Sequence, residues 1–89
     1  MKLTQEEKEL LIEWGFNEAD FEQIERATRK TVYEMDGKKI SGSEALEILG
    51  RETYLSGIAR SAFHFTSCRE NEKGQMVHFN SSKLFKWNE

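Results

Sequence analysis

Three side chains with metal-binding or nucleophilic chemistry fall close together in the second half of the sequence: His64, Cys68 and His78. His64 and Cys68 are spaced by one helical turn, and a following strand would return His78 toward them. Imidazole and thiolate are zinc ligands, but a complete set would also need Glu70 or Glu72. Neither a Cys-x-x-Cys nor a His-Glu-x-x-His motif is present. We therefore expect no metal and no cofactor, and a small metal- or thiol-dependent enzyme using these three residues remains the alternative.

A cationic helix face is the favoured candidate site. The periodicity predicts one long amphipathic helix over about residues 51–66, with Arg60 and His64 as i, i+4 neighbours opposite its apolar side. An arginine fork and a protonated imidazole together suit a phosphate or a carboxylate. The candidate ligand- or partner-binding residues are Arg60, His64, Ser56, Gly57, Phe63 and Arg51. Ser56 and Gly57 are small enough to allow close approach, whereas the competing interpretation is an ordinary solvated helix face.

A second charged surface is predicted near the N-terminus, where residues 1–25 contain eight acidic residues and two lysines. Glu6, Glu9 and Glu13 share one helix face and form a candidate acidic partner face. Carboxylates spaced in this way could imitate a phosphate backbone, although solvated helix faces commonly look the same. The net charge of −3 argues against direct binding of duplex DNA, because nucleic-acid binders usually carry a basic excess.

Composition sets the class of protein. Eighty-nine residues with ten aromatic side chains predict a single compact domain, 1–89, and one cysteine excludes a disulfide scaffold. No apolar run is long enough to cross a bilayer, and no signal-peptide pattern opens the chain. We therefore expect a soluble, cytoplasmic protein with no membrane partner.

The elements that position these side chains are marked by caps and turns. Thr4 with Glu7 and Ser41 with Glu44 are capping boxes, so helices are predicted after each. A second helix is expected from Asn17, with continuation toward residue 33 as its alternative. A hairpin is predicted at residues 36–37, where Asp-Gly separates two short strands, and a further strand over residues 75–79. The predicted class is α+β: four or five short helices packed on a small antiparallel sheet.

Most of the chain resembles a known group of proteins. The central residues of the likeness are Gly37-Lys38-Lys39-Ile40-Ser41, Glu44-Ala45, Leu49-Gly50-Arg51 and Tyr54-Leu55-Ser56-Gly57-Ile58-Ala59-Arg60-Ser61-Ala62-Phe63-His64. Leu-Ile-Glu-Trp-Gly-Phe at residues 11–16 and Phe-Asn-Ser-Ser-Lys at residues 79–83 extend it. These segments are similar to small prophage- and phage-associated proteins of Gram-positive bacteria, a group with no attached activity. The resemblance implies a phage or mobile-element accessory protein. Small proteins of that origin often bind a host factor, and many inhibit bacterial defence. The resemblance concerns this biological setting alone and assigns no residue a role.

These observations favour a non-enzymatic binding protein that uses a charged surface. The expected partner is a host protein or a small anionic ligand. A homodimer is also possible, with Phe63 at its seam if that ring is exposed. The hypothesis requires Arg60 and His64 to lie exposed on an unbroken helix.

Overall fold

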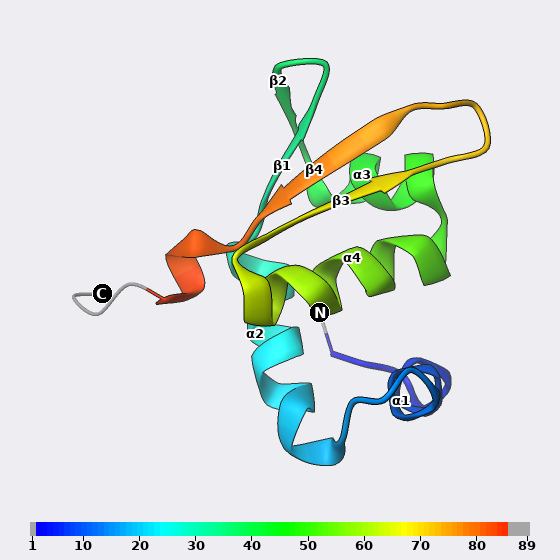
Figure 1. The fold of residues 1–89 in the computed structure, drawn as a ribbon, viewed down its shortest axis with the longest axis vertical. Coiled ribbons are helices and arrows are strands. Elements are labelled where there is room, and N and C mark those ends of the chain that lie inside the picture. The colour runs from blue at the N-terminus through cyan, green and yellow to red at the C-terminus, as the bar shows by residue number, and fades with distance from the viewer. Residues whose placement is uncertain (1, 86–89) are drawn as a thin grey trace.

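The computed structural model describes residues 2–85, which place a set of helices against a four-stranded sheet (Figure 1). The helices and 3-10 turns are α1 (Gln5–Glu13), η1 (Glu18–Asp20), α2 (Phe21–Lys30), α3 (Gly42–Leu49), α4 (Arg51–His64) and η2 (Ser82–Phe85). The strands are β1 (Val32–Met35), β2 (Lys38–Ile40), β3 (Thr66–Glu70) and β4 (Met76–Asn80). Neighbouring strands are antiparallel in the order β2-β1-β4-β3, which confirms the predicted α+β class.

Both predicted capping boxes form. The Thr4 hydroxyl accepts a hydrogen bond from the Glu7 N–H at 3.2 Å, and the Glu7 carboxylate accepts one from the Thr4 N–H at 2.8 Å. Ser41 and Glu44 make the same reciprocal pair at the start of α3. Each box satisfies backbone donors that a helix N-terminus otherwise leaves unpaired, so these two helices begin where the sequence predicts.

The region between α1 and α3 differs in detail from the prediction. A 3-10 turn follows Asn17, and the α-helical part begins only at α2. Continuation of that helix toward Tyr33 is wrong, because Tyr33 pairs with Ile40 in β2 and with Phe79 in β4. The Asp-Gly hairpin is confirmed: residues 36 and 37 have φ of 54° and 78°, as a type I′ turn requires.

Helix α4 ends two residues before the predicted boundary. Phe65 adopts a left-handed φ of 68°, and Thr66 already belongs to β3. The helical periodicity places both residues on the apolar side, yet the Phe65 side chain is 51% exposed and its ring lies 4.4 Å from that of Phe85. Strand pairing is the reason, since the Ser81 N–H donates to the Phe65 carbonyl at 2.7 Å and continues the β3–β4 ladder.

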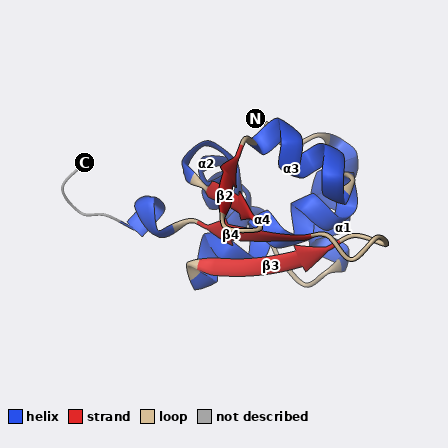
Figure 2. Ribbon diagram, turned by 90° about the horizontal axis from the view of Figure 1, so that it is seen from above, coloured by secondary structure: helices blue, strands red, loops and turns tan. Residues whose placement is uncertain are grey.

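The core lies between the sheet and the helices; in Figure 2, α4 lies behind β4, and α3 is drawn above β4 and β3. Val77 and Phe79 of β4 point inward and are buried, as are Leu55 and Ile58 of α4. The alternate residues of β4 are exposed, so the opposite face of the sheet is open. The sheet thus has one packed face and one open face.

Candidate functional site

Helix α4 packs so closely on the sheet that part of its predicted ligand-binding face is covered. A Cβ added at Gly57 would lie 2.5 Å from Cζ of the Phe79 ring. Gly57 is therefore small because the sheet approaches it, and its prediction as a point of ligand approach is wrong. Ser61, on the same helix, is fully buried and accepts a hydrogen bond from the Ser81 hydroxyl at 2.8 Å.

Strand β3 is tied to α4 by side chains that reach from strand to helix. The Ser67 hydroxyl donates to the Gly57 carbonyl at 2.7 Å. Nε of Arg69 donates to the Ser56 hydroxyl at 2.9 Å, and its Nη2 to the Ser56 carbonyl at 3.4 Å. Ser56 is half-buried and engaged by Arg69, so it too is unavailable as the small, open residue of the predicted site.

Arg60 and His64 are both exposed on an unbroken α4, as the helical periodicity predicts. Within residues 2–85, neither side chain makes a hydrogen bond or an ion pair. Ser56 and Arg60 are one turn apart, and the Arg69 guanidinium lies on Ser56, which places the guanidinium groups of Arg60 and Arg69 and the imidazole of His64 along one side of α4. We call Arg60, His64 and Arg69 the cationic edge.

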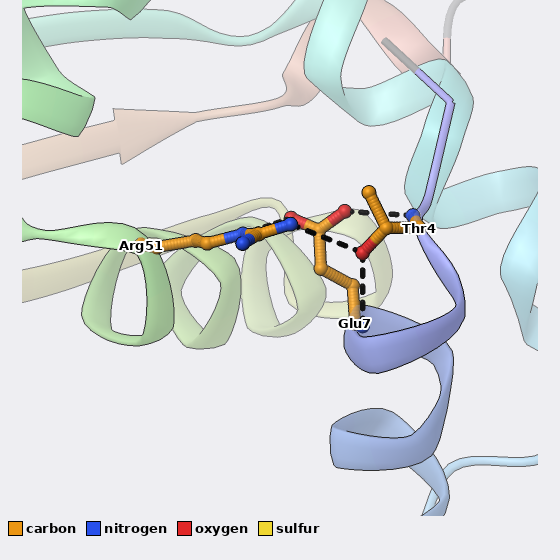
Figure 3. Close-up of polar contacts among 3 residues, drawn as sticks. All are labelled: Thr4, Glu7 and Arg51. Atoms are coloured by element: carbon orange, nitrogen blue, oxygen red, sulfur yellow. Dashed lines mark hydrogen bonds and ion pairs between the residues drawn. The ribbon is translucent and has the colours of Figure 1, made fainter.

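Two other residues predicted for this site lie elsewhere. The Phe63 ring is half-buried and 6.1 Å from the Phe16 ring, so it packs within the chain and does not form an exposed seam. Arg51 begins α4, at the end opposite to His64. Its Nη2 donates to the Thr4 hydroxyl at 3.1 Å and its Nε lies 3.5 Å from the Glu7 carboxylate (Figure 3). Arg51 therefore links two helix starts and is separate from the cationic edge.

The acidic face is partly as predicted. Glu6, Glu9 and Glu13 are all exposed on α1. Their neighbour Glu7 is instead buried, where it caps α1 and receives Arg51 (Figure 3). Its capping spacing from Thr4 was the sequence signal for this inward orientation.

The outer edge of β3, on the side away from β4, presents backbone groups that pair with no other strand in residues 2–85. The bonds from the Ser81 N–H to the Phe65 carbonyl and from the Asn71 N–H to the Gln75 carbonyl mark two hydrogen-bonded pairs of the β3–β4 ladder. Such pairs alternate along an antiparallel ladder, so the backbone groups of residues 66, 68 and 70 point away from β4. Nη1 of Arg69 donates to the Cys68 carbonyl at 2.8 Å and covers one of these groups.

The residues of the predicted metal or thiol site separate into two places. Cys68 and His78 are directly paired across β3 and β4 on the open face of the sheet, and Glu34 pairs with His78 from the other side. His64 lies on α4, in the helical layer. No group of three or more His, Cys, Asp or Glu side chains in residues 2–85 is placed to hold a metal ion. The described residues therefore lack the site that the metal-dependent alternative needs.

A tyrosine pair forms a polar contact inside the core. The hydroxyl oxygens of Tyr33 and Tyr54 lie 2.6 Å apart, and both rings pack against Phe79. Burial raises the pKa of both hydroxyl groups, and for Tyr33 the hydrogen bond to Tyr54 raises its pKa further. This pair keeps both hydroxyls neutral and supports the packing of α4 on the sheet.

The comparisons add no relative. No protein-family model, curated protein or solved structure matches this chain significantly. Within residues 2–85, no helix combines the length and the apolar composition needed to cross a bilayer. What the chain binds must therefore be inferred from the geometry of its own surfaces.

Proposed function

We propose that this chain is a non-enzymatic binding protein that holds an extended, acidic segment of another protein along β3. The observation that carries the proposal is the free edge of β3 together with Arg60 and His64 of the adjoining α4, two exposed side chains without partners in residues 2–85. Addition of a strand to a sheet edge obtains affinity from backbone hydrogen bonds and specificity from neighbouring side chains.

The backbone geometry determines what the segment would contact. Residues 66, 68 and 70 present outward N–H and C=O groups at alternate positions, the pattern that an incoming strand pairs with. Arg69 shields the Cys68 carbonyl, which protects an edge strand against indiscriminate pairing. A partner strand that pairs with β3 must donate to the Cys68 carbonyl, which already accepts from Arg69. A partner segment with a carboxylate that binds the Arg69 guanidinium would therefore bind preferentially.

Charge gives the edge a direction. Ser67 contacts Gly57 and Arg69 contacts Ser56, so α4 and β3 run in opposite directions. The end of α4 that carries Arg60 and His64 is therefore toward Thr66, and the end that carries Glu52 is toward Glu70. An incoming segment with its acidic side chains over the Thr66 end is attracted, and one with acids over the Glu70 end is repelled. The favoured partner segment is therefore acidic at one end only.

A second copy of this chain suits the edge poorly. Helix α4 runs alongside β3 and is joined to it through Ser67 and Arg69 (Figure 1). Pairing two β3 strands at about 4.8 Å would also require their α4 helices to fit side by side on the joined sheet, and packed helices need about 8–10 Å between their axes. A single strand brings no helix of its own, which favours a segment of another protein.

The resemblance to phage-associated proteins supplies the biological setting of the proposal. In that setting the partner is a host protein, such as a bacterial defence factor, and occupation of its acidic segment inhibits it. This part of the proposal depends on the likeness of residues 11–16, 37–64 and 79–83 to that group, and the edge geometry supports the binding mode alone.

The test uses a displayed library of random nine-residue peptides as probe, followed by affinity measurement on synthetic peptides that it selects. The informative variant is Cys68→Pro, which removes an outward N–H without breaking a β3–β4 hydrogen bond. Cys68→Ala is its matched control, because it loses the same thiol and keeps the N–H. We expect Cys68→Pro to weaken binding about tenfold and Cys68→Ala to leave it unchanged.

The charge component is tested on the same peptides. Arg60→Glu should weaken binding about tenfold and reduce its dependence on salt, while Glu52→Gln should strengthen it slightly. Selection of peptides without acidic residues, or equal affinity of Cys68→Pro and Cys68→Ala, would overturn the proposal. A dimer of the free protein that Cys68→Pro abolishes would replace the partner segment with a second copy.

A further inference from the structure

A basic pocket lies at the opposite edge of the sheet, where α2, β2, α3 and η2 meet. Its volume is about 370 Å³, and its lining residues include the cationic Arg29, Lys39 and Lys83. No acidic residue is among its lining residues in the described part of the chain. In a protein with a net charge of −3, three cationic residues around one hollow with no carboxylate among its lining residues form a local field that favours an anion.

The start of α3 adds backbone donors to this pocket. Gly42 and Ser41 are lining residues, and the capping box occupies the N–H groups of Ser41 and Glu44. The N–H groups of Gly42 and Ser43 make no hydrogen bond within residues 2–85. Of these two residues only Gly42 lines the pocket, and a free N–H at a helix start can bind a phosphate oxygen. The Glu44 carboxylate is already held by the Ser41 N–H and lies outside the lining.

We propose that this pocket binds a small molecule carrying two linked phosphates. Arg29, Lys39 and Lys83 come from three different elements and converge on the hollow, so they can surround a compact polyanion. A concave site of this size favours a small ligand, because a polynucleotide backbone requires an extended basic track. The pocket and the β3 edge lie on opposite sides of the sheet, so this inference is independent of the proposed function.

Inorganic pyrophosphate is the probe, and its binding to the whole chain is measured by calorimetry at low ionic strength. We expect a single site that weakens about tenfold or more in Lys39→Glu and in Lys83→Glu. Lys38→Glu is the matched control: Lys38 is an exposed neighbour in β2 that does not line the pocket. All three variants change surface charge by the same amount, so general electrostatics would affect them equally.

Amide NMR shifts locate the site independently. The largest change on adding pyrophosphate is expected at Gly42, with smaller ones at Ser43, Lys39 and Lys83. A short DNA duplex added in place of pyrophosphate should bind more weakly and shift no pocket amide. The inference is overturned by equal weakening in Lys38→Glu, by shifts spread over lysines outside the pocket, by tighter binding of the duplex, or by no binding at millimolar pyrophosphate.

Discussion

The contact between Gly57 and Phe79 predicts the sign of the change in unfolding free energy when Gly57 is replaced by alanine. Helix propensity predicts an increase, and tertiary packing predicts a decrease. In the interior of a helix, Gly→Ala normally stabilises by about 1 kcal/mol, because alanine loses less backbone freedom on folding. At Gly57, however, the new methyl carbon would lie 2.5, 2.7 and 2.8 Å from three carbons of the Phe79 ring. Carbon atoms normally approach to about 3.5–4.0 Å, so roughly 1 Å of overlap must be relieved.

The Phe79 ring has little room to move away. Its side chain is 1% exposed, with the Tyr33 ring edge-on at 5.4 Å and the Tyr54 ring at 6.0 Å. Overpacking at such a site costs about 1–3 kcal/mol or more, which exceeds the gain in helix propensity. We expect Gly57→Ala to lower the free energy of unfolding by about 1–2 kcal/mol and the midpoint temperature by about 5–15 °C.

Urea and thermal unfolding followed by circular dichroism measure this effect, and a double-mutant cycle identifies its cause. Phe79→Leu removes the ring, so adding Gly57→Ala in that background should be neutral or stabilising. The coupling between the two substitutions should reach about 1 kcal/mol or more. An increase in stability for Gly57→Ala alone would refute the reasoning, because it would mean that α4 does not rest against Phe79.

Two further predictions concern the tyrosine pair and the link between α1 and α4. Tyr33 and Tyr54 are the only tyrosines in the chain, and their raised pKa values mean that the unfolded chain releases protons first as pH rises above about 10. Stability should therefore be intact below pH 10 and fall above it, by about 1.4 kcal/mol per pH unit for each tyrosine, with tyrosinate absorbance appearing only on unfolding. Tyrosinate forming near pH 10 in folded protein would contradict this. Arg51→Ala removes one exposed ionic partner and should cost less than about 1 kcal/mol in urea unfolding. Glu7→Ala removes the carboxylate that accepts from the Thr4 N–H in the capping box and should cost about 1–2 kcal/mol. The reverse order would show that the ion pair outweighs the cap.

The elements confirmed from the sequence are those whose signals act within a few residues. Thr4 with Glu7 and Ser41 with Glu44 satisfy their own backbone donors locally, and Asp-Gly at residues 36–37 adopts the positive φ values that its turn needs. The exposure of Arg60 and His64 also follows from helical periodicity alone, because opposite sides of one helix are fixed by its geometry.

Strand β3 escaped the sequence analysis because its residues, Thr-Ser-Cys-Arg-Glu, are polar and carry no alternating apolar pattern. It is a strand because β4 pairs with it, and that pairing also ends α4 at His64. Since the free edge of the sheet belongs to β3, the surface carrying the proposed function was not visible in the sequence.

The positions of turns and helix starts and the charged side of α4 could be predicted from the sequence, because they depend on neighbours along the chain. Tertiary structure decided that Gly57 rests on Phe79, that Arg69 reaches Ser56, and that cations from α2, β2 and η2 surround one pocket. These contacts join residues distant in the chain, and their free energy exists only when the sheet and helices pack together.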